Sequence, residues 1–219
     1  MKVNKLISKN QDDNWFHRIT NECINDYPIS QVDIDADELV LDIGCNVGGF
    51  TEAYKNRFNN ILAIDASSYN IEQYQSRHHH PTLHKAVWSV DGEFLKLKKL
   101  MYKDSDTNSG NFSVMEHQWE EDWGWIGDEY EEVETISLET IIKPYDEIGL
   151  LKLDVEGAEV EFLLGKDLSK IKWITMELHN FLGGVKQKQL MTHIEQTHTE
   201  VFTTGNGNES HYTKLWKRN

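Results

Sequence analysis

The sequence has few cysteines, a shortage of basic residues and no long apolar run, and each absence excludes a class of protein. There are two cysteines in 219 residues, Cys23 and Cys45. Because Cys45 lies within a glycine-rich turn, we expect no disulfide framework, and a reducing, cytoplasmic location fits better. No apolar stretch approaches the roughly 20 residues of a membrane span, and the amino terminus lacks the core of a signal peptide.

The charge balance argues against a polyanionic partner. The chain carries 22 Lys and Arg against 37 Asp and Glu, which gives a formal net charge of −15. Proteins that bind nucleic acid normally display a basic face, so we expect no nucleic acid partner. With 38% hydrophobic residues, the chain can bury one substantial core. We therefore expect a helical extension over residues 1–36 and a single domain over residues 37–219.

The segment Leu39–Phe50 is the most informative part of the chain. Its apolar residues end at Asp42, and glycines such as Gly44 and Gly48 then allow a tight turn close to a ligand before a helix begins. A second apolar run ends at Asp65, about 20 residues past the turn, where a doubly wound fold grips ribose hydroxyls. The pattern therefore indicates a nucleoside cofactor.

Two nucleoside cofactors fit this strand–turn–helix unit, a nicotinamide dinucleotide and S-adenosylmethionine. A dinucleotide seats its pyrophosphate on a helix amino terminus and requires glycines in G-x-G-x-x-G spacing. Here Asn46 stands at the second glycine position, so the pattern fails. S-adenosylmethionine has no phosphate, and Asp42 with the Gly44–Gly48 backbone can supply partners for its ammonium and carboxylate. We favour S-adenosylmethionine and keep an NAD-dependent oxidoreductase as the rival hypothesis.

The order of the predicted elements indicates an α/β protein. After a helix at 12–24, strands at 39–43, 60–65 and 82–87 alternate with helices, which predicts a parallel sheet with right-handed crossovers. From about residue 90 to 135 an aromatic and acidic insertion with a half-buried strand interrupts this alternation. The remaining predictions are helices at 49–58, 68–77, 137–142, 158–164 and 185–196, and strands at 134–138, 149–154, 173–177, 199–204 and 211–216, the last two as an antiparallel pair.

Three segments, Asp42–Gly48, Thr135–Ile142 and Leu151–Glu159, resemble the FkbM family of methyltransferases, and Glu177–His179 resembles the acid and histidine that close the following strand there. The resemblance covers roughly residues 37–180, and the segment from Lys152 to Glu159 is its most specific part. It implies a Rossmann-like class I methyltransferase fold. That fold has a mostly parallel seven-stranded sheet with an antiparallel last strand, helices on both faces and a β-rich insertion after the third strand. The implied activity is S-adenosylmethionine-dependent methyl transfer.

The expected cofactor-binding residues lie in the glycine turn and after the second and third strands. Asp65 is expected to accept hydrogen bonds from the ribose, although Asp65-Ala66-Ser67 replaces the Glu-Pro that is usual in the family. Cys45 stands where the family more often has alanine, which is a small exchange. The full set of expected cofactor-binding residues is Asp42, Gly44, Cys45, Asn46, Gly48, Asp65, Ala66, Ser67, Ala86 and Val87.

The expected catalytic residues follow two later strands. Asp154 ends an otherwise apolar strand at the edge where open α/β sheets bind ligands, so we expect it to contact cofactor, bind a metal or act as a base. His179, with Glu177 two residues before it, is the most plausible general base for a hydroxyl acceptor. The alternative is that Asp154 and Glu177 bind Mg²⁺, which polarises a sugar diol.

A cluster of aromatic residues in the insertion bears on the acceptor. Trp119, Trp123, Trp125 and Tyr130 can form a lid that stacks on a sugar, or can pack the insertion against the core. The family resemblance and this cluster favour O-methylation of a sugar or glycan hydroxyl. A polyketide or another small molecule stays open as the acceptor, as does a catalytically idle module that binds a nucleoside or glycan.

Overall fold

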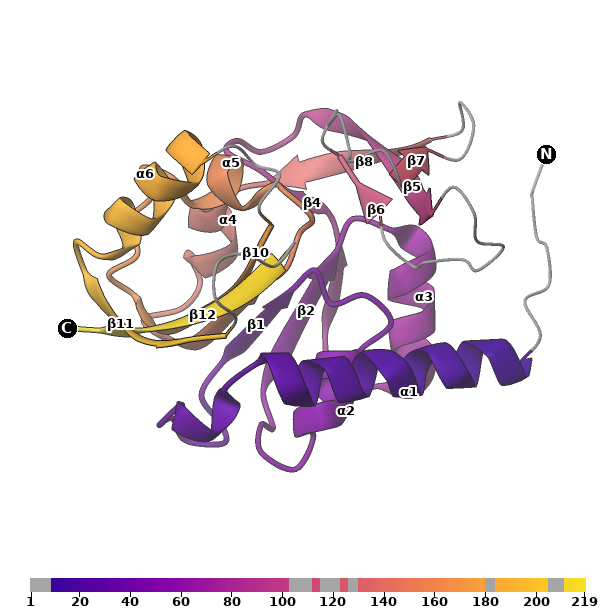
Figure 1. The fold of residues 1–219 in the computed structure, drawn as a ribbon, viewed down its shortest axis with the longest axis horizontal. Coiled ribbons are helices and arrows are strands. Elements are labelled where there is room, and N and C mark those ends of the chain that lie inside the picture. Colours follow the sequence, from indigo (N-terminus) through magenta and orange to yellow (C-terminus); the bar gives the residue numbers. More distant parts are fainter. Residues whose placement is uncertain (1–8, 103–111, 115–122, 126–129, 180–183, 205–210) are drawn as a thin grey trace.

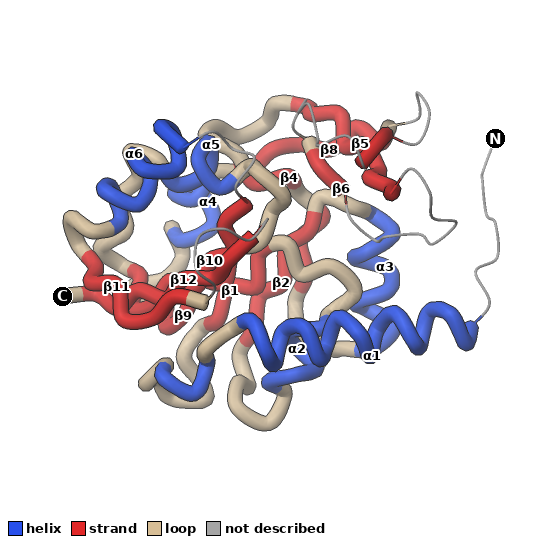
Figure 2. Tube along the Cα trace, viewed as in Figure 1, coloured by secondary structure: helices blue, strands red, loops and turns tan. Residues whose placement is uncertain are grey.

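A computed structural model describes residues 9–102, 112–114, 123–125, 130–179, 184–204 and 211–219. Seven strands form one sheet in the order β11-β12-β10-β9-β1-β2-β3, seen at the centre of Figures 1 and 2. The strands are β1 (Val40–Ile43), β2 (Ile61–Asp65), β3 (Thr82–His84), β9 (Ile148–Leu153), β10 (Ile171–His179), β11 (His198–Thr203) and β12 (His211–Arg218).

The direction of the strands agrees with the prediction. Strands β3, β2, β1, β9 and β10 run parallel to one another. Strand β12 lies between β10 and β11 and is antiparallel to both. The predicted parallel sheet with an antiparallel last strand is therefore confirmed, as is the antiparallel pairing of the last two strands.

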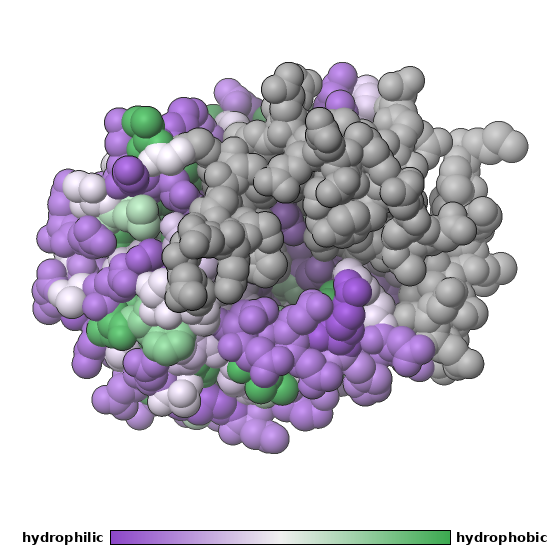
Figure 3. All heavy atoms as spheres, viewed as in Figure 1, coloured by the Kyte–Doolittle hydropathy of each residue, from purple (hydrophilic) through white to green (hydrophobic). Residues whose placement is uncertain are grey.

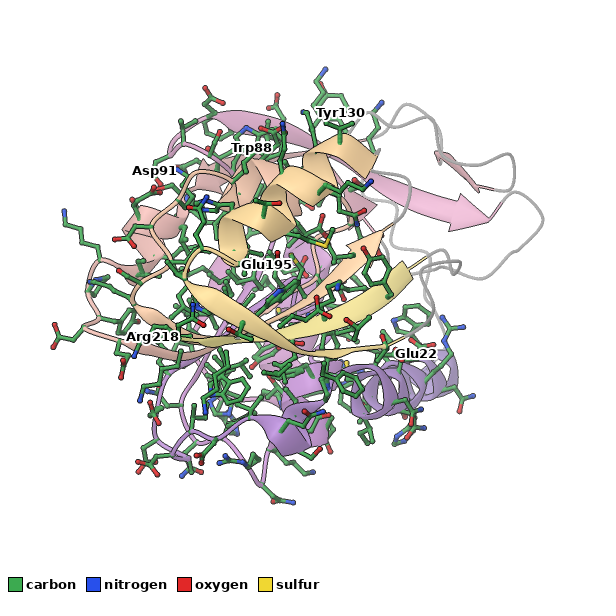
Figure 4. All side chains as sticks on the ribbon, turned by 60° about the vertical axis from the view of Figure 1, so that its left-hand side comes forward. Glu22, Trp88, Asp91, Tyr130, Glu195 and Arg218 are labelled. Carbon is green, nitrogen blue, oxygen red and sulfur yellow. The ribbon has the colours of Figure 1, made fainter. Side chains whose placement is uncertain are left out.

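Helices cover both faces of this sheet, and its central strands are accordingly buried throughout. Every residue of β1 and β9 is buried, as the continuous apolar runs predict for strands covered on both sides. Figure 4 shows the sheet between the helix that carries Glu22 and the helix next to Glu195. The helices are α1 (Lys9–Asp26), α2 (Gly49–Tyr54) and α3 (Ser68–Arg77) in the first half, and α4 (Leu138–Ile142), α5 (Glu159–Leu163) and α6 (Gly184–Ile194) in the second, with a 3₁₀ turn at Ile29–Gln31.

Two hydrophobic clusters lie on opposite faces of the large sheet, and each contains residues of different helices. The cluster on one face joins Ile19 of α1 and Phe50 of α2 to the sheet. The cluster on the other face joins Leu138 of α4, Phe162 of α5 and Leu190 of α6 to it. Outside the core, hydrophilic residues dominate the coloured surface in Figure 3, in keeping with the net charge of −15. None of the helices in the described ranges is long and apolar enough to cross a membrane.

The insertion forms a second, smaller sheet that lies beyond one end of the large one (Figure 1). Its strands run in the order β4-β8-β5-β6, and β7 also pairs with β5. The presence of these strands after β3 confirms the predicted β-rich insertion. They are β4 (Ala86–Val87), β5 (Phe94–Tyr102), β6 (Phe112–Ser113), β7 (Trp123–Trp125) and β8 (Glu131–Ile136).

Three predicted boundaries are wrong for identifiable reasons. The strand expected at 82–87 divides into β3 and β4, because β2 ends at Asp65 and β4 pairs with β8 of the small sheet instead. The helix expected at 49–58 ends at Tyr54, and the next residues form a turn onto Tyr54 O. Strand β10 extends to His179 rather than ending before it, because its last residues pair with β12.

The turn after β1 requires glycine at position 44. Gly44 has φ +70°, and a Cβ built there would lie 1.6 Å from the main-chain oxygen of Asp154. The close approach joins the ends of β1 and β9, and Asp154 N also donates to Ile43 O at 3.1 Å. A side chain at position 44 therefore has to separate these two strand ends.

We expect Gly44→Ala to lower the free energy of unfolding by more than about 4 kcal/mol, because it adds a steric clash to an unfavourable φ. Gly92→Ala is the matched control, since Gly92 has φ +76° but nothing within 4 Å of an added Cβ. The control is expected to lose about 1–2 kcal/mol, the cost of the left-handed conformation alone. Urea unfolding followed by circular dichroism measures both, and equal losses would contradict the account.

Candidate functional site

A cleft lies at the carboxyl ends of β1, β2 and β9, the edge where open α/β sheets bind ligands. It encloses about 620 Å³ of empty space, including the part open to solvent. Its lining comes from the three strand ends, from the segment after β3, and from Leu97 and Val114 of the small-sheet region. The cleft is thus formed between the two sheets.

Six of the expected cofactor-binding residues line this cleft, and four do not. The six are Gly44, Asn46, Asp65, Ala66, Ala86 and Val87. The other four are buried beside it and have structural contacts. Asp42 lies in a polar cluster described below, Cys45 packs with Tyr74, Gly48 lies against the ring of His78, and Ser67 Oγ accepts from Asn70 N to cap α3.

The glycine turn uses its own main-chain donors. Each of the five N–H groups from Gly44 to Gly48 donates a hydrogen bond within the protein, so none points freely into the cleft to bind a phosphate. The pairs, at 2.8–3.1 Å, are Gly44 and Cys45 to Ile64 O, Asn46 to Asp65 Oδ2, Val47 to Asn46 Oδ1, and Gly48 to Cys45 O.

The first residue of α2 packs against α1. A Cβ added at Gly49 would lie 2.4 Å from Ile19 Cγ2 of α1. Gly49 is not among the residues that line the cleft. This arrangement differs from a dinucleotide site, in which the helix amino terminus receives the pyrophosphate.

Asp65 is fixed by three donors and retains capacity for a ligand. Its carboxylate accepts from Asn46 N at 2.8 Å, Ser67 N at 2.8 Å and Asn70 Nδ2 at 3.2 Å. An ionised carboxylate has about four acceptor sites, so these donors leave one for a group in the cleft. Burial raises the pKa of Asp65, and the three hydrogen bonds oppose this rise.

A buried lysine connects the ends of β1 and β9. Lys152 is 3% exposed, and its Nζ donates to Gly44 O at 2.7 Å. The same atom lies 3.3 Å from Asp42 Oδ1 and 3.8 Å from Asp154 Oδ2. Burial alone would lower the pKa of Lys152, but the two carboxylates outweigh it and raise the pKa above its ordinary value. Lys152 therefore stays charged.

Lys152 is a residue that the sequence analysis missed as a site component. The signal was present, because a single lysine interrupts the apolar strand Ile148–Leu153 immediately before Asp154. On the far side of Asp42, Thr51 Oγ1 donates to Asp42 Oδ2 at 3.3 Å. Burial raises the pKa of Asp42, while Lys152 and Thr51 oppose the rise.

The expected catalytic residues occupy three different places. Asp154 lines the cleft, with a side chain 27% exposed. Glu177 is half-buried in β10, where the register Met176↔Leu153 puts it beside Asp154, but it is not in the cleft lining. His179 is the last residue of β10 and pairs through its main chain with His211; its side chain is outside what the structure describes.

Glu156 is a third acidic residue of the cleft, beside Asp65 and Asp154, and the predicted site did not include it. It has φ +50°, and its main-chain oxygen accepts from Ser113 Oγ at 3.0 Å, which ties the loop after β9 to β6. Burial, and then the charge of Asp154, raise the pKa of Glu156. In the same loop, Glu159 Oε1 accepts from Val155 N and Gly157 N, both at 3.3 Å.

Two further predictions concern a metal and a substrate lid. Within the described ranges, no three His, Cys, Asp or Glu side chains are grouped so that they could hold a metal ion. At Asp154 the ammonium of Lys152 already supplies positive charge. Trp119 lies outside the described residues, and Trp123 and Trp125 are described only as main chain of β7. The sugar lid therefore stays a prediction.

Comparison with known proteins identifies the kind of domain. The family model described as the methyltransferase FkbM domain matches residues 42–203. No curated protein sequence matches the chain.

The solved structures that are similar to the chain share little sequence with it. They include a putative methyltransferase from Pseudomonas syringae (11% identity, 92% of this chain and 97% of that one, TM-score 0.49). A TehB-like SAM-dependent methyltransferase from Corynebacterium glutamicum has 8% identity, 97% and 100% coverage and a TM-score of 0.48. Magnesium protoporphyrin IX methyltransferase from Synechocystis, solved with bound SAM, has 8% identity, 96% and 81% coverage and a TM-score of 0.46.

We expect Lys152→Met to destabilise the protein by about 3–5 kcal/mol at neutral pH, because it leaves Asp42 buried without its counter-charge. Without Lys152, the pKa of Asp42 in the folded state rises further above its value in the unfolded state. The folded state gains a proton as the pH falls, so the loss should be largest near pH 8 and smaller near pH 5.

The matched control is Lys172→Met. Lys172 is a partly exposed lysine that pairs with Glu38 and Glu147. We expect this change to cost within about 1 kcal/mol, as is usual for surface pairs. Urea unfolding at several pH values measures both variants. A Lys152→Met variant no less stable than the control would show that the buried cluster is unimportant.

Proposed function

The chain belongs to the FkbM methyltransferase family, and on this premise we propose that it transfers a methyl group from S-adenosylmethionine to a hydroxyl of a sugar or glycan. The observation that carries the choice of cofactor is the glycine turn, whose five N–H groups are all used within the protein. A pyrophosphate would find no donors there. This argues against the NAD-dependent oxidoreductase.

The charges of the cleft support a cationic cofactor. Among the described residues, the acidic side chains of Asp65, Asp154 and Glu156 line it against the ammonium of Lys85, and the raised pKa of Glu156 reduces that residue's share of the negative charge. Lys152 lies behind this lining and is balanced by Asp42 and Asp154. S-adenosylmethionine carries a sulfonium and an ammonium against one carboxylate, so the field of the cleft favours it, whereas a dinucleotide brings two phosphate charges.

The residues of the cleft fit the parts of this cofactor. The open acceptor site of Asp65 suits a ribose hydroxyl. Gly44 and Asn46, beside Lys152 and Asp154, are placed for the methionine end. Ala86, Val87 and Leu97 offer an apolar wall for the adenine ring.

The chemistry requires a base close to the acceptor hydroxyl. When bound, S-adenosylmethionine supplies an electrophilic methyl group on its sulfonium. A hydroxyl is a poor nucleophile until its proton begins to leave. Asp154 lines the cleft and also lies beside β10. We therefore assign it as the residue that orients the hydroxyl and receives its proton. His179 stays an alternative base, with Glu177 beside it.

The choice of acceptor rests on the charge of the cleft and on the aromatic residues of the insertion. The acidic lining of the cleft disfavours phosphorylated acceptors and suits neutral hydroxyl compounds. In the insertion, β7, with Trp123 and Trp125, pairs with β5, the strand whose Leu97 lines the cleft. Aromatic rings suit the C–H faces of sugars, so a neutral glycan is proposed ahead of a polyketide.

We expect the chain to transfer radiolabelled methyl from S-adenosylmethionine to a neutral member of a panel of glycans, sugar nucleotides and macrolides. The label should resist mild alkali, because a methyl ether does and a methyl ester does not. Asp154→Asn should lower the turnover number by about 10²–10⁴-fold, the usual contribution of a general base. His179→Ala should retain it within about tenfold, a margin well below that range.

Glu161→Gln serves as the control for these variants, since Glu161 is a carboxylate of α5 that pairs with Lys186 away from the cleft. The opposite ranking, with His179 essential and Asp154 dispensable, would move the base to His179. Label found on nitrogen, or alkali-labile label, would contradict O-methylation of a hydroxyl.

A further inference from the structure

Tyr27 reaches the cleft acid from outside the matched family region. It follows α1, whereas the family match begins at residue 42. Its hydroxyl donates to Asp154 Oδ2 at 3.2 Å, across 127 positions of sequence. The ring is 4% exposed, so the hydroxyl lies within the protein, behind the carboxylate.

Several contacts hold Tyr27 in this position. The edge of its ring packs on Phe50 with centroids 5.7 Å apart and planes at 89°. Tyr54 Oη donates to Tyr27 O at 3.1 Å. The contact of Ile19 with Gly49 fixes α1 on α2 close by. These contacts join the amino-terminal segment rigidly to α2.

The contacts of Asp154 are one-sided. In the part of the chain that the structure describes, its carboxylate is contacted by Tyr27 Oη and by Lys152 Nζ, and both contacts are at Oδ2. The residue nevertheless lines the cleft. A carboxylate held by one oxygen presents the other, Oδ1, to whatever enters.

We propose that Tyr27 is a positioning residue of the site, which holds Asp154 by Oδ2 so that Oδ1 faces the bound cofactor and acceptor. This inference rests on the proposed function. The amino-terminal segment then contributes to the site. Tyr27 does not touch the reacting groups and acts through Asp154.

The charges around the pair are consistent with this role. Burial, and then the charge of Asp154, raise the pKa of Tyr27, so its hydroxyl remains a donor at physiological pH. Loss of that donor removes the hydrogen bond that holds Oδ2 of Asp154. The other titratable groups near the pair are Cys23 of α1, Asp42 of β1, Lys152 of β9, Glu156 of the following loop and Glu177 of β10.

The test compares two ligands by calorimetry on the full chain. S-adenosylmethionine carries the sulfonium charge and S-adenosylhomocysteine does not. When Asp154 is held in position, its carboxylate should therefore favour binding of S-adenosylmethionine. Tyr27→Phe removes the hydroxyl and keeps the ring. We expect it to weaken S-adenosylmethionine binding about three- to tenfold, the usual contribution of one hydrogen bond, with S-adenosylhomocysteine binding nearly unchanged.

A double-mutant cycle separates positioning from general damage. In the Asp154→Asn background, Tyr27→Phe should have no further effect on the preference between the two ligands. Tyr145→Phe is the control, because Tyr145 follows α4, packs against the sheet core and is not among the residues that line the cleft. It should leave the preference unchanged, and thermal unfolding of each variant monitors stability.

The outcomes distinguish this inference from the proposed function. Equal weakening of both ligands by Tyr27→Phe, or an undiminished effect in the Asp154→Asn background, would overturn the role of Tyr27 alone. Failure of the unmutated chain to bind either ligand would overturn the proposed function, and the inference with it.

Discussion

The buried ammonium of Lys152 is the constraint on which the cleft depends. It donates to the carbonyl oxygen of Gly44 and pairs with both Asp42 and Asp154, so one positive charge holds the ends of β1 and β9 together. Removing such a charge from water costs several kcal/mol, which good geometry and several acceptors offset. The close approach of Gly44 to the main chain of Asp154 completes the connection. The floor of the cleft is therefore held in place by a buried charge cluster in which one lysine faces two carboxylates.

The charged side chains that line the cleft are mainly acidic, and the glycine turn after β1 has no free N–H donors. The N–H groups from Gly44 to Gly48 hold the turn together and fix Asp65, so they are not available to an anion. A nucleoside with positive charge meets carboxylates at both ends of such a site. In a dinucleotide fold this turn binds the pyrophosphate. Here its N–H groups are used within the protein, so side chains are left to bind the ligand.

The sequence predicted features that depend on nearby residues and missed those that depend on distant ones. The apolar runs around Asp42 and Asp65 identified β1 and β2, because burial on both faces leaves a local pattern. The division of the predicted strand at 82–87 could not be seen, since it depends on where β2 ends and on a partner in β8. Tyr27 lies 127 positions from Asp154, and no local pattern marks it.

Calorimetry of the unmutated chain with S-adenosylhomocysteine and with NAD tests the central claim most directly. The acidic cleft and the occupied turn predict binding of S-adenosylhomocysteine and no binding of NAD at the same concentration. Asp65→Asn should weaken S-adenosylhomocysteine binding, because one acceptor oxygen for the ribose is lost. Tight binding of NAD with no response to S-adenosylhomocysteine would contradict the account.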